Sequence, residues 1–170
     1  MKKPFQKTAR IIVYKKEKDK MEPEIKSKPA FTVVGIKHRG KKFSKEIPQL
    51  WFEFGRRMNE IKHKTGPAYG VMDSYDEKSG EFDYVAGIGV DSTADIPENM
   101  VSIDVPGQTY AVFACTLPTL AETYQHFYEI WLPQSNYKRV DGPEFELYDE
   151  TFNPADETSM LYIYIPVMKK

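Results

Sequence analysis

Apolar and polar residues alternate along several short stretches of the chain, a pattern typical of strands with one buried face. β-Branched and aromatic side chains fill many of the apolar positions, and Gly, Pro or Asp residues lie between the stretches. The expected strands span residues 31–39, 68–75, 82–90, 100–105, 108–115, 145–148 and 160–167. Strands therefore dominate the expected structure.

Two other stretches repeat their apolar residues at helical spacing. These residues are Leu50, Phe54, Met58 and Ile61 in the first stretch, and Leu120, Tyr124, Phe127, Tyr128, Trp131 and Leu132 in the second. Ser44 is a candidate cap for the first helix, and Gly66-Pro67 predicts where that helix stops. The second helix is expected to begin near Pro118, with Thr116 as its candidate cap.

The order of these elements occurs twice along the chain, at an offset of 76 residues. Residues 66–71 match residues 142–147 at this offset, and other strands match in the same way. Each half, at about 31–91 and 100–168, has the order strand, helix, strand, strand. Because neither half alone would bury much surface, we expect the two to pack as a pseudo-dimer around one sheet system.

Composition and charge narrow the class of protein. The chain has 170 residues and a net charge of −1, so there is no whole-chain case for direct nucleic-acid binding. Cys115 is the single cysteine, which fits a reducing cytosol, and its apolar strand predicts a buried thiol. No apolar run is long enough to span a membrane, and the start lacks a signal core. The expected location is cytoplasmic.

Residues 1–29 differ from the rest of the chain. They are rich in lysine and contain one short apolar run, Ile11–Tyr14. We expect them to form an N-terminal arm or edge segment, and residues 30–170 to form the domain. Alternating Lys and Glu residues favour a solvated segment over a nucleic-acid-binding arm.

Metal and cofactor chemistry finds little support in the sequence. His38, His63 and His126 are far apart and have no ligand spacing or cysteine partner, so no metal site is expected. No Gly-rich phosphate loop and no Ser-His-Asp arrangement can be identified, so neither a cofactor nor a catalytic triad is expected.

Glu146 is the residue with the most distinctive surroundings. Alternation along 144–148 puts Glu144, Glu146 and Tyr148 on one face of a strand, and Phe145 and Leu147 on the other. A carboxylate among aromatic residues is costly to bury unless a cation or hydrogen-bond donors meet it. It could line a pocket and bind a ligand cation, or it could be a surface glutamate on an edge strand.

Aromatic residues are abundant, at 14% of the chain, with eleven tyrosines. Most are expected to be ordinary sheet residues, and either tryptophan could be pure core. We expect Trp51 and Trp131 to be partly exposed to a pocket beside their helices. Further candidate lining residues are Tyr69, Tyr84, Tyr110, Phe113, Tyr148, Tyr162 and Tyr164. Alternation allows only a subset of them to face one pocket.

Several segments together resemble the GyrI-like, or AraC-type, effector-binding domain of bacterial multidrug-responsive transcription regulators. The run from Trp131-Leu132-Pro133 to Gly142-Pro143-Glu144-Phe145-Glu146-Leu147-Tyr148 is the most specific of them. The other matching segments are residues 34–36, 50–54, 69–71, 84–88, 105–113, 128–135 and 162–167. Together they cover about residues 30–168.

This resemblance implies an α+β fold, a duplicated βαββ unit with an aromatic-lined central pocket between the halves. It also implies that a glutamate at the position of Glu146 lies in that pocket and faces cationic, lipophilic ligands. Regulators of the family carry a helix-turn-helix domain before this one. Only about 30 residues precede the match here, so we expect a stand-alone sensor or binding protein.

Function hypotheses from three classes follow. The chain is expected to sense or sequester lipophilic, cationic aromatic compounds, with no cofactor and no catalytic residue. Alternatively, it hydrolyses strained electrophilic molecules, as some GyrI-like relatives do, with Glu146 as general base and tyrosine hydroxyls as donors. A third alternative is a gyrase-inhibitor-like module that binds a partner protein.

Overall fold

One antiparallel sheet of nine strands organises residues 21–170, the part of the chain that the computed structural model describes. Its strands are β1 (Glu24–Lys28), β2 (Phe31–Lys41), β3 (Lys64–Asp73), β4 (Glu81–Val90), β5 (Val101–Val105), β6 (Gln108–Thr116), β7 (Tyr137–Arg139), β8 (Glu144–Tyr148) and β9 (Met160–Lys169). The helical segments are α2 (Glu46–Arg57), η1 (Met58–Glu60), η2 (Leu117–Thr119), α3 (Leu120–His126), the π-helical turn η3 (Phe127–Trp131) and α4 (Leu132–Gln134).

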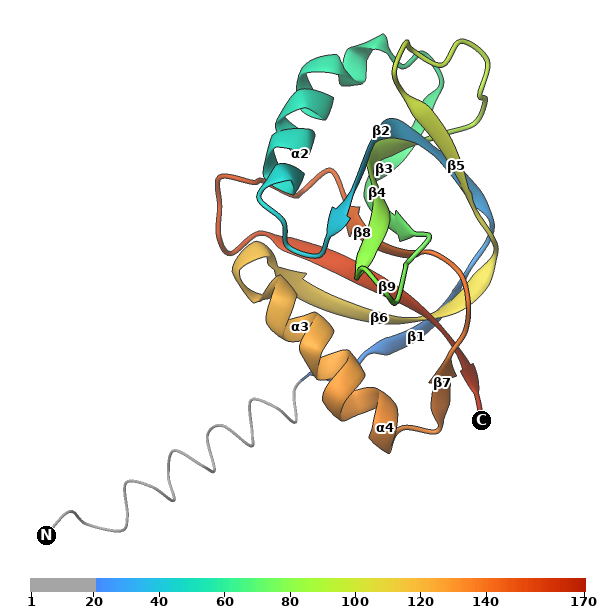
Figure 1. Cartoon of the computed structure of the whole chain (residues 1–170), viewed down its shortest axis with the longest axis vertical. Coiled ribbons are helices and arrows are strands. Elements are labelled where there is room, and N and C mark those ends of the chain that lie inside the picture. Colours follow the sequence, from blue (N-terminus) through green and yellow to red (C-terminus); the bar gives the residue numbers. More distant parts are fainter. Residues whose placement is uncertain (1–20) are drawn as a thin grey trace, which may run out of the picture.

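The strand order shows the duplication directly (Figure 1). Along the sheet the strands follow the order β1-β6-β9-β8-β3-β4-β2-β5, and β7 pairs with β9. Each half contributes strand, helix, strand, strand, and the halves join where β3 pairs with β8. In that pair Gly70 lies opposite Glu146, and these residues are themselves 76 positions apart. The pseudo-twofold axis therefore passes between them, and the predicted duplicated βαββ fold is confirmed.

The edge strands extend the duplication beyond the predicted halves. β1 and β5 lie at nearly equivalent positions of the 76-residue offset, and each pairs with the first long strand of the other half. β1 pairs with β6, and β5 pairs with β2. The sheet therefore begins at Glu24, inside the expected N-terminal arm. The apolar run Ile11–Tyr14 lies outside the described residues.

The first helix differs from its prediction at both ends. Its N-cap is Lys45, with no side-chain cap, so the expectation that Ser44 caps it is wrong. The α-helix ends at Arg57, and Gly66-Pro67 lies inside β3, where the pairing with β4 is irregular. Extended backbone is what the residue before a proline favours, so this dipeptide belongs in a strand as readily as at a helix stop.

The second helix keeps its predicted cap and gains an irregular turn. Thr116 and Thr119 form a capping box at the start of η2. The helix then widens into the π-helical turn η3, a feature that occurs frequently at functional sites. This turn supplies Tyr128, which contacts the site described below.

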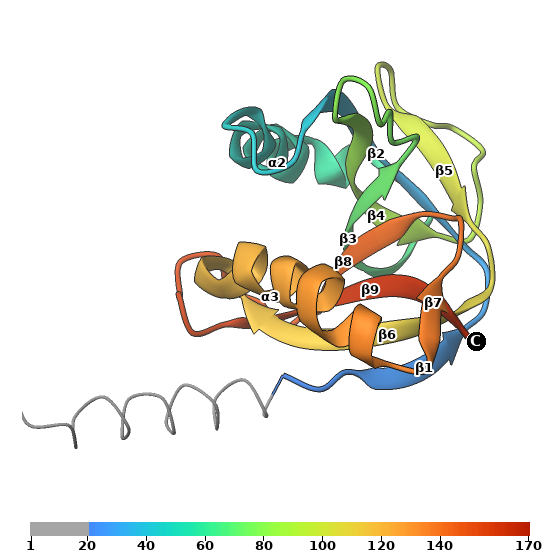
Figure 2. The same ribbon diagram turned by 60° about the horizontal axis from the view of Figure 1, so that its bottom comes forward.

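The two faces of the sheet carry separate apolar clusters. α2 and α3 lie on the same side of the sheet, one over each half (Figure 2). The cluster beneath them includes Phe54, Phe127 and Tyr148. The other face carries the second cluster, which includes Tyr69 and Phe145. Because successive strand residues point to opposite faces, the predicted division of residues 144–148 between the two faces is confirmed.

Candidate functional site

Glu146 is a buried acid at the centre of the sheet. It lies on β8, on the face covered by the helices, and its residue is 5% exposed. Tyr84 Oη donates to Glu146 Oε2 over 2.7 Å, and Tyr148 Oη donates to the same oxygen over 2.8 Å. Within residues 21–170, no hydrogen bond ends on Glu146 Oε1, and no ion pair involves Glu146.

Trp51 connects this arrangement to the first helix. Its Nε1 donates to Tyr84 Oη over 2.8 Å, so the tyrosine hydroxyl accepts one bond while it donates another. The indole also packs edge-on against the Tyr148 ring, with centroids 4.9 Å apart. We call Trp51, Tyr84, Glu146 and Tyr148 the Glu146 cluster. Its hydrogen-bond chain fixes both the carboxylate and the rings around it.

Gly70 provides the space that the cluster needs. It faces Glu146 across the β3–β8 pair, at the pseudo-twofold axis. A Cβ at this position would lie 2.1 Å from Tyr84 Oη and 2.7 Å from Glu146 Oε2. The missing side chain therefore lets a tyrosine hydroxyl and a carboxylate meet directly over the backbone of β3.

Burial sets the acidity of the cluster. Loss of water raises the pKa of Glu146 above its ordinary value of 4.5, because burial disfavours the charged carboxylate. The bonds from Tyr84 and Tyr148 and the positive charge of Lys42 act in the opposite direction. Burial and the neighbouring carboxylate also hold the pKa of both tyrosines well above the ordinary range, so their hydroxyls stay protonated as donors.

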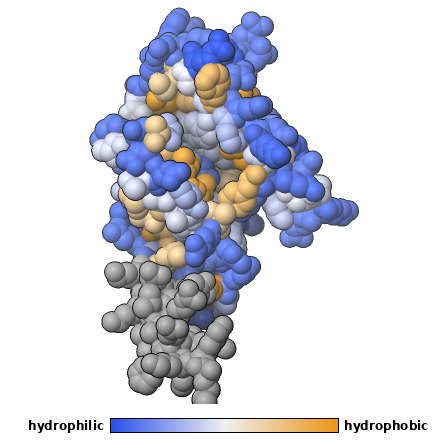
Figure 3. All heavy atoms as spheres, turned by 90° about the vertical axis from the view of Figure 1, so that its left-hand side faces the viewer, coloured by the Kyte–Doolittle hydropathy of each residue, from blue (hydrophilic) through white to orange (hydrophobic). Residues whose placement is uncertain are grey.

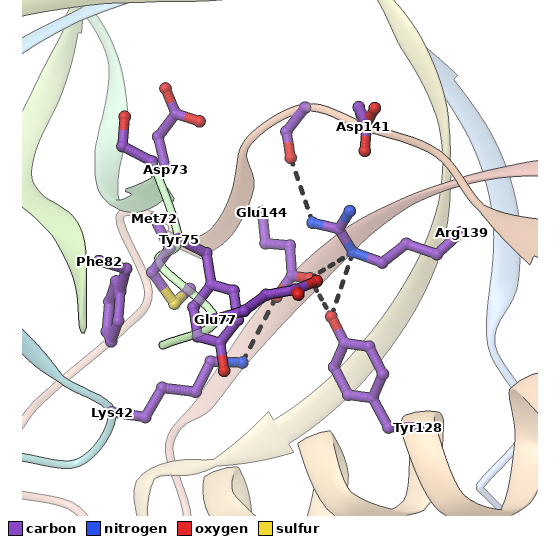
Figure 4. Close-up of a pocket in the computed structure, with 12 residues that line it drawn as sticks. Lys42, Met72, Asp73, Tyr75, Glu77, Phe82, Tyr128, Arg139, Asp141 and Glu144 are labelled. Carbon is purple, nitrogen blue, oxygen red and sulfur yellow. Dashed lines mark hydrogen bonds and ion pairs between the residues drawn. The ribbon is translucent and has the colours of Figure 1, made fainter. Parts of the chain in front are cut away.

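Glu144, two residues earlier on the same strand face, carries a different set of partners (Figure 4). Its Oε1 accepts from Tyr128 Oη and, over 2.9 Å, from Arg139 Nε. Its Oε2 lies 3.7 Å from Lys42 Nζ. Glu144 is thus buried as a paired acid, whereas Glu146 has only neutral donors among the described residues.

A cavity of about 670 Å³ opens beside Glu144. Met72 and Phe82 form apolar parts of its wall, and Glu146 is not among its lining residues. The remaining lining residues are Lys42, Asp73, Ser74, Tyr75, Glu77, Tyr128, Arg139, Asp141, Gly142 and Glu144, with more acidic than basic side chains. From the side on which α2 and α3 lie, apolar atoms gather in the middle of the surface, with hydrophilic atoms around them (Figure 3).

The structure divides the predicted pocket residues into three groups. Trp51, Tyr84 and Tyr148 contact one another around Glu146. Trp131, the last residue of η3, packs against Phe113 of β6 with ring centroids 6.1 Å apart, and its indole donates to Glu22. The third group belongs to the second apolar cluster and comprises Tyr69, Tyr110, Tyr162 and Tyr164.

The third group lies on the face opposite Glu146. Tyr110 and Tyr164 both pack against Phe145, whose side chain points away from the Glu146 cluster. Tyr69 also points away from Glu146, because its neighbour Gly70 faces Glu146 and successive strand residues point to opposite faces. The structure therefore separates Tyr69, Tyr110 and Tyr164 from Glu146, against the expectation that they line one pocket with it.

Several residues beside the site were missing from the sequence prediction. Lys42 lies just after β2, Tyr124 and Tyr128 lie on the second helix, and Arg139 ends β7. The sequence does contain a signal for Gly70, because the 76-residue offset of the repeat makes it the counterpart of Glu146. The others become neighbours only through the packing of separate elements, which no local pattern of the chain encodes.

Residues 21–170 offer neither a metal-ligand cluster nor a membrane-spanning helix. No group of three or more His, Cys, Asp or Glu side chains in this range is arranged to hold a metal ion. Nor is any helix there long and apolar enough to cross a membrane. The predicted burial of Cys115 is confirmed, and burial raises the pKa of its thiol to about 12, which disfavours the nucleophilic thiolate.

The chain matches a class of effector-binding proteins. A family model, Cass2, described as integron-associated effector binding protein, matches residues 24–167. The chain therefore belongs to the Cass2 family of effector-binding proteins, in agreement with the resemblance found in the sequence.

The chain is also 39% identical over 152 residues to the transcriptional regulator BrlR of Pseudomonas aeruginosa. This match covers 86% of the chain and 56% of BrlR, so the chain spans little more than half of that relative.

Solved structures share the fold at lower identity. SAV2435, whose structure contains bound tetraphenylphosphonium, superposes with a TM-score of 0.68 at 21% identity, over 87% of this chain and 94% of that one. An integron cassette protein of Vibrio cholerae superposes with a TM-score of 0.63 at 20% identity, over 86% of this chain and 96% of that one. At such identities these likenesses establish the fold alone.

Proposed function

We propose that the chain binds lipophilic aromatic cations as effectors and that Glu146 supplies the negative charge that selects them. The observation that carries this proposal is a carboxylate held at 5% exposure by two tyrosine hydroxyls, without an ion-pair partner in residues 21–170. A buried acid of this kind gains most from a ligand that brings a positive charge and little water.

The surroundings of the acid support the same class of ligand. Trp51 and Tyr148 offer ring faces and edges next to the carboxylate, and aromatic rings attract cations that have shed their water. SAV2435 shares the fold and was solved with tetraphenylphosphonium, a lipophilic aromatic cation. Glu146 is 5% exposed, so a ligand that meets its carboxylate has to displace part of the surrounding side chains.

Binding of tetraphenylphosphonium is the direct test, with tetraphenylborate as a probe of nearly the same shape and the opposite charge. Isothermal titration calorimetry is expected to detect the cation and to find the anion bound at least roughly 100-fold more weakly, because a buried carboxylate repels it. Neutral triphenylphosphine oxide should lie between them. Equal affinities for cation and anion would contradict charge selection by this site.

The pH dependence of cation binding should follow Glu146. Its pKa is raised above 4.5, so the carboxylate protonates and loses its charge as pH falls through a range above 4.5. Tetraphenylphosphonium does not titrate, so its affinity is expected to fall in that range and to level off at higher pH. Titrations from pH 8 down to pH 5 measure this. In Glu146→Gln the affinity should depend much less on pH. If the affinity fell with pH as it does in the unaltered protein, another titrating group would be responsible.

The same pKa shift predicts the sign of a stability effect. In the unfolded chain Glu146 ionises near 4.5, whereas in the folded protein it holds its proton to higher pH. The protonated acid therefore favours the folded state at low pH, and this contribution is lost as pH rises through the raised pKa. A bound cation restores it by stabilising the ionised form, so ligand-induced stabilisation should be larger at pH 8 than at pH 5.

A further inference from the structure

The two oxygens of Glu144 face different neighbours. Oε1 is occupied by Tyr128 and by Arg139, which also bonds the backbone carbonyl of Val140. Oε2 receives no hydrogen bond within residues 21–170, and the Lys42 ammonium lies 3.7 Å from it. Oε1 of this buried carboxylate is thus held by two donors, whereas Oε2 has a single, longer contact with the Lys42 ammonium.

The Lys42 ammonium also lies over two aromatic rings. Its Nζ is 4.8 Å from the centroid of the Tyr124 ring and 5.3 Å from that of the Tyr128 ring. Both distances fall within the range of cation–π attraction. Glu144 Oε2 and these two rings therefore form a place for a cation, and we call these three groups the second cation site.

Lys42 is a weakly fixed occupant of this site. It lies directly after β2, its side chain is 35% exposed, and the following residue Phe43 adopts a positive φ of 58° on an exposed loop. An ammonium with this much access to water exchanges its contacts for hydration at small cost. The rings and Glu144, in contrast, are anchored on α3, η3 and β8.

We propose that the second cation site accepts the ammonium end of an elongated ligand, and that Lys42 fills it until such a ligand displaces the lysine. This inference rests on the proposed function, in which the lipophilic cation itself binds at Glu146. Glu144 and Glu146 are two residues apart on one strand face, so their Cα atoms are about 7 Å apart. A cation with an amino group at that distance can meet both carboxylates.

The cavity beside Glu144 suits the polar arm of such a ligand. Asp73, Glu77 and Asp141 line it together with Glu144, and they give the approach a negative potential. Met72 lies in the same wall and also contacts the Tyr124 hydroxyl. The cavity thus adjoins the second cation site, on the sheet face that carries Glu146.

The test uses two ligands that differ in one group. (4-Aminobutyl)triphenylphosphonium carries a second positive charge at the end of its chain, and pentyltriphenylphosphonium has nearly the same shape without it. The measured quantity is the affinity for the aminobutyl ligand divided by the affinity for the pentyl ligand. In Lys42→Met the vacated site should raise the ratio roughly 10-fold above that of the unaltered protein. In Glu144→Gln the advantage of the amino arm should largely disappear.

Lys41→Met is the matched control. It removes the same charge from the neighbouring residue of an exposed strand end, so it reproduces any general change in potential. Its ratio should stay within about twofold of the unaltered protein. Because Glu144→Gln disturbs the buried contact with Arg139, its thermal unfolding is measured alongside, and Lys42→Met carries the test if that variant does not fold.

The possible outcomes separate the two proposals. If both phosphonium ligands bind through Glu146 but the ratio is the same in Lys42→Met and Lys41→Met, the second cation site is contradicted and the proposed function stands. If neither ligand binds the unaltered protein, the proposed function fails and this inference fails with it. A ratio that rises in Lys42→Met and falls in Glu144→Gln supports the site.

Discussion

Glu146→Gln is expected to weaken tetraphenylphosphonium binding by roughly 10- to 100-fold. A charge-assisted contact contributes about 1.5–3 kcal/mol, and each 1.4 kcal/mol is about tenfold in affinity. Glutamine keeps the shape of the side chain, and its amide oxygen still accepts from Tyr84 and Tyr148. The variant therefore removes the charge while leaving the surrounding rings in place. Calorimetry with the purified protein measures the loss.

Two comparisons show whether that loss reflects charge. Tetraphenylborate should bind Glu146→Gln no more weakly than it binds the unaltered protein, because its repulsion by the carboxylate is gone. Glu150→Gln removes the same charge from an exposed residue beyond the end of β8 and should leave both affinities within about twofold. Equal losses for the cation and the anion would mean that Glu146 shapes the site without selecting charge.

Protein stability gives an independent check on this variant. Burial raises the pKa of Glu146, so an uncharged side chain avoids the cost of a desolvated carboxylate. Glu146→Gln should consequently unfold at the same temperature as the unaltered protein, or higher, near neutral pH. Lost binding in a protein of unchanged stability cannot then be attributed to unfolding.

The strand face of Glu146 could be predicted from the sequence because it depends on one strand alone. Alternation over residues 144–148 is enough to separate Glu144, Glu146 and Tyr148 from Phe145 and Leu147. The duplicated topology was predictable for a related reason, since a repeated order of elements with an offset of 76 residues implies two equivalent halves. Their joining at β3 and β8 brings Gly70 opposite its own counterpart, Glu146.

The remaining partners depend on register between strands and on loops, and alternation does not specify either. Tyr84 reaches Glu146 because it pairs opposite Met72, two residues from Gly70 on the same face of β3. If the strand register shifted by one residue, Tyr84 would point to the other face of the sheet. The residues before and after it would then point toward Glu146. Lys42 reaches Glu144 from a loop whose path depends on tertiary packing.

Gly70→Ala is expected to damage both stability and binding, although it adds a single methyl group. The new Cβ would lie 2.1 Å from Tyr84 Oη and 2.7 Å from Glu146 Oε2, far inside contact distance. Tyr84 is 2% exposed and bonded to Trp51 as well as Glu146, so its ring has little freedom to retreat. Overpacking of this kind costs about 1–3 kcal/mol, which urea unfolding measures.

Gly66→Ala on the same strand is the matched control. Its Cβ would meet the nearest backbone atom at 3.4 Å, an ordinary contact, so little change in stability is expected. If Gly70→Ala were as stable as Gly66→Ala, the close packing of the Glu146 cluster over β3 would be contradicted.

A double variant with Tyr84→Phe isolates the contact that causes the damage in Gly70→Ala. Removing the hydroxyl relieves the shortest clash but leaves the ring carbon Cζ 2.7 Å from the new Cβ, so the relief is partial. The double variant should therefore lose less stability than the sum of the two single variants, by a coupling of about 0.5 kcal/mol or more. Cation affinity should fall at least roughly 10-fold in Gly70→Ala, since the displaced hydroxyl no longer positions the carboxylate that the ligand meets. If the stability losses of the two single variants were additive, the methyl group would act on the β3 backbone and not on Tyr84. The absence of a side chain at Gly70 would then matter for the strand and not for Glu146.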